Sequence, residues 1–157
     1  MKRLNFVLDV DGVMTTGQFL YSADGKAFKI FGPHDSDGLK LIKDKVQIEF
    51  ITADKRGYPI TQKRIIEDMG YPLVLVSEED RLAYIKKKYS LDELIYMGDG
   101  YYDADVLRAC RFGIAPHNAR KEAKEAADFV TESDSGNGAV LDACLEIKKR
   151  LEQNQWI

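Results

Sequence analysis

The sequence predicts an α/β fold: a doubly wound parallel sheet with helices on both faces, forming a three-layer sandwich. Short apolar runs alternate with segments of helical period along the 157 residues, and this alternation is typical of βαβ units. The apolar runs are nearly continuous, as expected for parallel strands that are buried on both faces. Right-handed crossovers between such strands would place the helices in two outer layers.

The first strand is expected at residues 4–10, an apolar run that leads into Asp9-Val10-Asp11-Gly12. Between residues 15 and 31, two runs rich in aromatic and β-branched residues flank Ala23-Asp24-Gly25-Lys26, which predicts a β-hairpin after the first strand. The other core strands are expected at residues 46–52, 72–76, 94–97, 112–115 and 129–131.

Helical segments are expected between these strands and after the last one. Asp35 or Ser36 is expected to cap the first helix, and Gly70 to end the second. The acidic run 78–80 is expected in the first turn of the third helix, where negative charge is favourable. The helical segments are expected at residues 35–45, 56–69, from 77 onward, at 103–110, at 119–127 and after Gly138.

Composition limits the class of protein. An apolar content of 45% fits a single domain, residues 1–157, with a real core, and the net charge of −3 argues against a nucleic-acid partner. No apolar run approaches the roughly 20 residues of a membrane helix, so no membrane association is expected. The beginning of the sequence lacks a signal-peptide pattern. Cys110 and Cys144 lie in apolar stretches, which predicts buried reduced thiols and a cytoplasmic location.

Two carboxylates follow the first expected strand. Alternation along a strand points Asp9 and Asp11 the same way, and Gly12 allows a sharp turn after them. Carboxylates held that close repel each other, so a proton or a cation is expected between them. On its own, this pattern is equally compatible with an ordinary polar turn at the end of a strand.

Further polar residues occur just past other expected strands: Thr52, Arg81, and Asp99 with Asp103. In open α/β sheets the ligand crevice lies outside the carboxyl ends of the strands. Scattered loop residues would not need this regularity. The coincidence therefore favours one functional pocket over the ordinary-turn reading.

The segment Asp9-Val10-Asp11-Gly12-Val13 resembles the first motif of the haloacid dehalogenase superfamily of phosphatases. A later Thr, then a basic residue, then Gly98-Asp99-Gly100-Tyr101-Tyr102-Asp103 are similar to the remaining motifs. The hairpin segment, the run HDSDGLKLIK and Gly136-Asn137-Gly138-Ala139-Val140 resemble the capless subgroup of 3-deoxy-D-manno-octulosonate 8-phosphate phosphatases. The resemblance covers nearly the whole chain.

The resemblance implies a mechanism that the residue types allow. Asp9 would attack the phosphorus of a phosphomonoester, and Asp11 would act as general acid and then general base. Mg²⁺ would be held by the carboxylates of Asp9 and Asp99 and by the backbone carbonyl of Asp11. Asp103 would orient these ligands without binding the metal itself.

The resemblance also implies a phosphate-binding set. Thr52, with backbone N–H groups near Ala53, would bind the phosphoryl oxygens, and Arg81 would neutralise their charge. The subgroup usually has Lys where this chain has Arg81. Lys86 is the alternative cation, and an ion pair between Arg81 and Glu78 is the alternative role for Arg81.

The leaving-group pocket is less defined by the sequence. The usual Thr-Gly-Arg of the subgroup is replaced here by residues 52–56, so the octulosonate substrate is in question although the chemistry is not. His34, Asp35, Lys55 and Arg56 are candidates for binding a sugar carboxylate or hydroxyls. For His34 an ordinary surface-loop position is the favoured alternative.

No segment of the sequence is long enough to form a cap domain. In the resembled subgroup the hairpin packs between the subunits of a tetramer, so a homotetramer is expected. Hairpin side chains that fold back on their own core are the alternative. The apolar side chains concerned are Phe19, Tyr21, Phe28, Ile30 and Phe31.

The expected function is hydrolysis of a small phosphomonoester that depends on Mg²⁺, with a sugar-acid phosphate of the 3-deoxy-octulosonate or nonulosonate type as substrate. A phospho-accepting receiver module is the alternative, because it also uses clustered acids, a Thr and a Lys on a doubly wound sheet. A catalytically retired scaffold is a further alternative, and the presence of all four acids argues against it.

Overall fold

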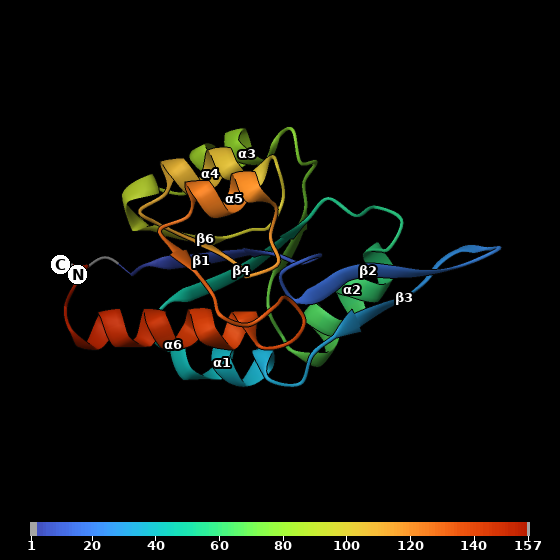
Figure 1. The fold of residues 1–157 in the computed structure, drawn as a ribbon, viewed down its shortest axis with the longest axis horizontal. Helices are drawn as coiled ribbons and strands as arrows, with labels where there is room; N and C mark the ends of the chain where they lie inside the picture. The colour runs from blue at the N-terminus through green and yellow to red at the C-terminus, as the bar shows by residue number, and fades with distance from the viewer. Residues whose placement is uncertain (1–2, 157) are drawn as a thin grey trace.

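The computed structural model describes residues 3–156, and its centre is a six-stranded parallel sheet (Figure 1). The strands are β1 (Asn5–Asp9), β4 (Gln47–Thr52), β5 (Leu73–Leu75), β6 (Leu94–Met97), β7 (Phe112–Ala115) and β8 (Phe129–Val130). Their order is β5-β4-β1-β6-β7-β8, and every neighbouring pair is parallel. The chain therefore winds outward from β1 in both directions, which confirms the predicted doubly wound sheet.

Helices cover both faces of the sheet. They are α1 (Asp35–Ile42), α2 (Tyr58–Gln62), α3 (Arg81–Lys88), α4 (Asp103–Ala109), α5 (Lys121–Ala126) and α6 (Ala139–Glu152). Helices α3, α4 and α5 lie on one face and α1 and α6 on the other, as Figure 1 shows. A π-helix (Lys63–Asp68) continues α2, and a 3₁₀-helix (Leu91–Glu93) precedes β6.

The core consists of two apolar layers, one on each face of the sheet. Phe6 and Leu8 of β1 point into the layer beneath α1 and α6, whereas Val7 points into the layer beneath α3, α4 and α5. All three side chains have no exposed surface. This alternation explains why β1 reads as a continuous apolar run, because a strand covered on both faces has no solvent side.

A two-stranded antiparallel hairpin, β2 (Thr15–Ser22) and β3 (Gly25–Phe31), follows β1 and extends away from the sheet. It turns at Ala23 and Asp24, where the sequence predicts it. Phe31 packs against the core, whereas Tyr21 and Phe28 are more than 60% exposed. The hairpin is the only addition to the sandwich among the described residues, and no cap domain is present in residues 3–156.

Three helix starts differ from the expectation. No side chain of α1 caps its own first turn, because the Asp35 carboxylate accepts a hydrogen bond from Leu141 N–H at the start of α6 instead. Helix α2 begins at Tyr58, two residues late, with Pro59 in its first turn, where proline is tolerated. Helix α3 begins at Arg81, so the acidic run 78–80 precedes it rather than forming its first turn.

The second helical segment ends as predicted. Gly70 takes a φ of +79°, a left-handed conformation that glycine adopts without steric cost. The N–H of Tyr71 then bonds to the carbonyl of Ile65, which turns the chain toward β5. No helix among the described residues is long and apolar enough to cross a bilayer.

Candidate active site

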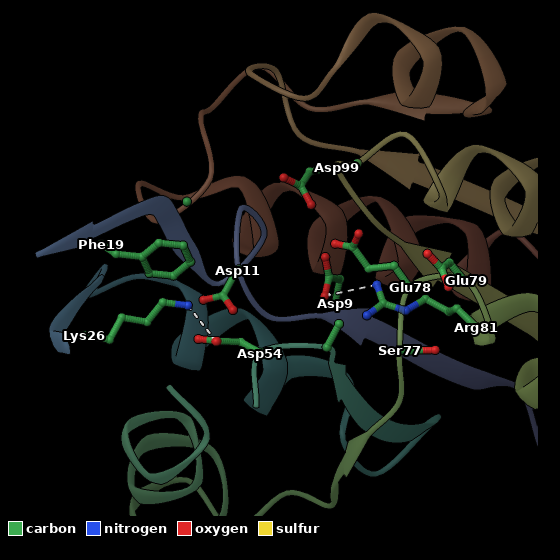
Figure 2. A pocket seen from close by; sticks show the side chains of 13 residues that line it. Asp9, Asp11, Phe19, Lys26, Asp54, Ser77, Glu78, Glu79, Arg81 and Asp99 are labelled. Atoms are coloured by element: carbon green, nitrogen blue, oxygen red, sulfur yellow. Dashed lines mark hydrogen bonds and ion pairs between the residues drawn. The ribbon is translucent and has the colours of Figure 1, made fainter. Parts of the chain in front are cut away.

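A cavity of about 540 Å³ opens at the carboxyl edge of the sheet, beside the hairpin. Figure 2 shows Asp9, Asp11 and Asp99 directed toward the same space, with Phe19 on one side and Arg81 on the other. The carboxyl ends of β1, β4, β5 and β6, with the segments that follow them, supply most of this lining, as expected for a doubly wound sheet. Its acidic lining residues are Asp9, Asp11, Asp54, Glu78, Glu79 and Asp99, and its basic ones are Lys26 and Arg81.

Asp9 is the last residue of β1 and is almost fully buried. Its Oδ1 accepts a hydrogen bond from the N–H of Val10 at 2.9 Å and lies 3.2 Å from Nη1 of Arg81. Burial raises the pKa of Asp9 well above its usual range; Arg81 opposes this rise, and the carboxylates of Asp103 and Asp99 add to it. The site therefore holds more negative charge than its own cations offset.

Arg81 begins α3, and its guanidinium reaches Asp9 at the end of β1 with only 2% of the residue exposed. Nη1 lies 3.1 Å from Oδ1 of Asp103 and 3.4 Å from the hydroxyl of Tyr96. Burial alone would lower the pKa of Arg81, but Asp9, Tyr96 and Asp103 raise it, so the side chain is a permanent cation. Nε is buried without a hydrogen-bond partner among the described residues.

Asp103 has four hydrogen-bond donors around its carboxylate. Oδ1 accepts from Arg81 and from the hydroxyl of Tyr96 at 2.5 Å, and Oδ2 accepts from the N–H groups of Asp99 and Gly100 at 3.0 and 2.9 Å. A carboxylate that is this fully occupied orients its neighbours rather than binding a ligand of its own.

A divalent cation fits the acidic end of the cavity. Carboxylate oxygens of Asp9, Asp99 and Asp103 lie within 4.8 Å of one another. Because Asp103 is occupied by its four donors, Asp9 and Asp99 are the carboxylates available to a metal. Burial, with the charge of Asp103 next, raises the pKa of Asp99 to about 7, as expected for a carboxylate whose charge needs a cation.

Gly12 is what allows Asp99 to approach the loop after β1. A Cβ on Gly12 would overlap the Asp99 carboxylate, and the residue takes a φ of +80°. Both observations require glycine at this position. The glycine of the first motif therefore does more than turn the chain, because it leaves room for an acid from β6 beside those from β1.

Asp11 lies nearer the hairpin than Asp9 does. Its carboxylate is 3.0 Å from Nζ of Lys29 on β3, and its Oδ1 lies 3.5 Å from the hydroxyl of Thr15. Asp9 and Asp11 thus have different buried cations, Arg81 from α3 and Lys29 from the hairpin.

The phosphate-binding residues expected from the sequence are distributed around the end of β4. Thr52 is fully buried, and its Oγ1 accepts a hydrogen bond from the N–H of Asp54 at 3.1 Å. Ala53 lines the cavity, as does Arg81. The alternative role of Arg81, an ion pair with Glu78, is not what the structure has, because the partners of Arg81 are Asp9 and Asp103.

None of the four candidate residues for the leaving group lines the cavity. His34, Lys55 and Arg56 are exposed side chains outside it, and Asp35 is buried against the amino end of α6. Asp54 differs from the two basic residues that follow it. Its side chain points inward and pairs with Lys26 and Lys29, whereas the next two side chains are exposed.

Five residues of the site did not figure in the sequence-based set. Lys26 and Phe19 come from the hairpin, with Nζ of Lys26 3.6 Å from the centre of the Phe19 ring. Lys29 and Asp54 form an ion pair at 2.8 Å, and Tyr96 lies within an otherwise apolar strand. One signal in the sequence could have pointed to these residues: Asp54 stands where the resembled subgroup has a basic residue. An acid at this position needs cations nearby, and Lys26 and Lys29 of the hairpin supply them.

Comparison with known proteins places this geometry in a family. A model of haloacid dehalogenase-like hydrolases matches residues 81–143. The 3-deoxy-D-manno-octulosonate 8-phosphate phosphatase KdsC of Haemophilus influenzae is 32% identical over 145 residues, which cover 88% of this chain and 79% of that protein.

Solved structures agree with the sequence match. The 3-deoxy-D-manno-octulosonate 8-phosphate phosphatase of Moraxella catarrhalis, in complex with magnesium, phosphate and KDO, has a TM-score of 0.79 at 25% identity, covering 98% of this chain and 91% of that one. The cobalt-bound phosphatase YrbI of Haemophilus influenzae has a TM-score of 0.78 at 28% identity, covering 98% and 95%.

The fold and the site define the class: this chain belongs to the haloacid dehalogenase-like hydrolases. Within that class it is a phosphatase that resembles KdsC. The match to hydrolases does not support the receiver module or the retired scaffold that the sequence left as alternatives.

Proposed function

We propose that this protein hydrolyses a phosphomonoester through an aspartyl-phosphate on Asp9, with Mg²⁺ as cofactor. The observation that carries the proposal is the convergence of Asp9, Asp99 and Arg81 on one cavity. A nucleophile and a general acid two residues apart on one strand end, with a guanidinium beside them, are suited to in-line phosphoryl transfer.

Hydrolysis would take two steps at Asp9. A carboxylate oxygen of Asp9 forms a bond to phosphorus while the bond from phosphorus to the ester oxygen breaks. Asp11 gives its proton to the departing alkoxide. In the second step Asp11 takes a proton from water, whose oxygen attacks phosphorus and displaces Asp9 as a free carboxylate.

The residues that would hold Mg²⁺ are Asp9 and Asp99 through their carboxylates and Asp11 through its backbone carbonyl. Few protein oxygens, completed by phosphate and water, are what this ion prefers. When bound, the ion offsets the repulsion between an anionic nucleophile and an anionic substrate. Asp103 holds Asp99 in place through the Asp99 N–H, without joining the ligand set.

The phosphoryl oxygens would be bound by Arg81, by the Thr52 hydroxyl and by backbone N–H groups near Ala53. The buried, unpaired Nε of Arg81 supports this assignment, because a buried donor without a partner is costly until an acceptor arrives. Arg also binds phosphate bidentately, which makes it a competent replacement for the usual Lys.

We assign a sugar phosphate as substrate class, and within it a sugar-acid phosphate of the 3-deoxy-octulosonate or nonulosonate type. The relationship to KdsC and the open cavity without a cap support this assignment. The leaving group would contact the hairpin side of the cavity, which Phe19 and Lys26 line. Residues 1–157 would act as a single catalytic domain.

The test is phosphate release from p-nitrophenyl phosphate and from a panel of sugar-acid phosphates, neutral sugar phosphates and nucleotides. Asp9→Asn should abolish turnover, because an amide cannot form the acyl phosphate. Asp105→Asn, the same change at an exposed position on α4, is the matched control and should retain wild-type rates. Substantial activity of Asp9→Asn would remove the proposed nucleophile.

Metal dependence is measured on the same protein. Chelation should stop turnover, and added Mg²⁺ should restore it. Unchanged turnover after complete chelation would contradict the metal assignment. A neutral sugar phosphate or a nucleotide with the highest kcat/KM would replace the proposed substrate class and leave the chemistry intact.

We further propose that the hairpin mediates a homotetramer. Tyr21, Phe28 and Ile30 expose 62%, 65% and 42% of their surface, and adjacent exposed apolar side chains mark interfaces. Phe31 does not contribute, because it packs against its own core. Light scattering that finds only monomer at micromolar concentration would reject the tetramer.

The cytoplasm remains the proposed compartment, since Cys110 and Cys144 are buried free thiols.

A further inference from the structure

Lys29 is a buried lysine on the inner side of the hairpin. Its side chain has no exposed surface, although it belongs to a strand that projects from the sandwich. Lysine is almost never fully buried unless its ammonium group is paired. The hairpin therefore reaches into the molecule at Lys29, and the partners of this residue indicate its role.

Three groups from three separate segments surround the ammonium nitrogen. Nζ lies 3.0 Å from both carboxylate oxygens of Asp11, 2.8 Å from Oδ2 of Asp54 and 2.7 Å from the hydroxyl of Thr61. The ammonium group donates hydrogen bonds to Asp11 Oδ2 and to the Thr61 hydroxyl, and its contact with Asp54 is an ion pair. Lys29 thus joins the loop after β1, the loop after β4 and helix α2.

The anchors of Lys29 are themselves held in place. Asp54 accepts a hydrogen bond from the N–H of Gly57 at 3.1 Å and one from Lys26 at 2.6 Å. A Cβ on Gly57 would overlap the Asp54 carboxylate and would lie 2.8 Å from Cε of Lys29. The ammonium group therefore has partners that are themselves fixed without Asp11.

We propose that Lys29 is a positioning residue for Asp11, a role that rests on the proposed function. A general acid acts only when its proton lies within hydrogen-bond reach of the departing oxygen, and a displacement of about 1 Å can cost on the order of 100-fold in rate. Contact with both oxygens of Asp11 fixes the plane of the carboxyl group as well as its place. Lys29 does not line the cavity, so it acts through Asp11.

The readout that separates positioning from a structural role is the dependence on the leaving group. p-Nitrophenolate leaves with little help from an acid, whereas an alkoxide needs a proton. Lys29→Met should lower kcat for an alkyl phosphate by about 10- to 100-fold and kcat for p-nitrophenyl phosphate by less than about 3-fold. Asp11→Asn should also lower kcat more for the alkyl phosphate than for p-nitrophenyl phosphate, and by a larger factor than Lys29→Met.

Lys26→Met is the matched control. Like Lys29, Lys26 pairs with Asp54, at 2.6 Å, but it does not hold Asp11. Because Lys26 lines the leaving-group side of the cavity, this variant is compared on kcat: it should change kcat for the two substrates by the same factor, and a change in KM reports the lost cavity contact. A larger loss on the alkyl phosphate for Lys26→Met, equal to that of Lys29→Met, would overturn the inference, because disturbance of Asp54 would then explain both.

Folding is controlled separately. If Lys29→Met does not fold, Lys29→Met combined with Asp54→Asn removes one charge of each sign and is measured instead. Equal losses on both substrates, or a crystal structure of either variant with Asp11 in its wild-type rotamer and place, would overturn the inference. Failure of the proposed function looks different, because wild type and Asp11→Asn would then be equally inactive on both substrates.

Discussion

The two carboxylates of the first motif are held by two different cations, and the contrast between them separates two roles in the site. Arg81 holds Asp9 from α3, lines the cavity and keeps Nε without a partner. Lys29 holds Asp11 from the hairpin, does not line the cavity and is enclosed by Asp11, Asp54 and Thr61. A cation that lines the cavity with a donor to spare is suited to bind substrate, whereas one enclosed by its partners is suited to fix its neighbour.

The difference also shows why arginine and lysine are not interchangeable here. The planar guanidinium reaches Asp9, Asp103 and Tyr96 through a single nitrogen, Nη1, which under the proposed function leaves its other nitrogens for phosphate. A compact ammonium fits the centre of three converging oxygens, as Lys29 does. The shape of each cation therefore matches the arrangement of the oxygen atoms around it.

The largest expected effect is that of Arg81→Met. Loss of a charged donor from a phosphoryl-transfer site should lower kcat/KM by about 100- to 1000-fold. The loss should be equal for p-nitrophenyl phosphate and an alkyl phosphate, because Arg81 does not act on the leaving group. Steady-state kinetics on both substrates check this, and a variant within twofold of wild type would remove Arg81 from phosphate binding.

Arg81→Lys is the companion variant that keeps the charge. Arg81→Met leaves the buried Asp9 and Asp103 without their cation, which is destabilising by about 3–5 kcal/mol. Arg81→Lys should fold and retain part of the activity, with circular dichroism reporting the fold. The loss of kcat in Lys29→Met, described above, is the next largest expected effect. It should be greater for the alkyl phosphate than for p-nitrophenyl phosphate.

The smallest expected effect concerns stability in acid. Burial alone would raise the pKa of Asp54, but hydrogen bonds with Lys26, Lys29 and Gly57 lower it to about 2, from an ordinary value of 3.8. Between these values the unfolded chain binds more protons than the native one, so stability falls as the pH falls. The contribution of Asp54 is fully present above about pH 4 and is lost toward pH 2.

Asp54→Asn should therefore lower the thermal unfolding midpoint at neutral pH, by the equivalent of about 2 kcal/mol. The gap between wild type and variant should close as the pH is lowered from about 4 to 2. Circular dichroism melts across this range measure it. A gap that is constant with pH would mean that the Asp54 charge is not what Lys29 and Lys26 stabilise.

The sequence was sufficient for the sheet because its strands are buried on both faces. Strands β6 and β7 have the bounds expected from their apolar runs, and the acids at strand ends converge as the topology requires. These features depend on local pattern and on one general rule of sheet architecture. Helix starts were less accurate, because Asp35 bonds to α6, about 100 residues further along the chain.

The leaving-group side could not be read in the same way. Lys29 looks like an ordinary polar residue of a hairpin strand, and only the packing of Thr61 and Asp54 around it shows its burial. Tyr96 belongs to an apolar run, so nothing in the sequence distinguishes its hydroxyl from core packing. Which neighbour in a loop turns inward, Asp54 or Lys55, is decided by contacts that are distant in sequence.

The hairpin has one further consequence. Because Lys29 lies on the projecting hairpin while Asp11 lies in the loop after β1, the proposed general acid is tied both to the hairpin and to the end of a core strand. A second subunit that packs against the hairpin would thereby restrict the motion of Asp11 without contacting Asp9. Assembly and bond cleavage would then be mechanically linked through a single ammonium group.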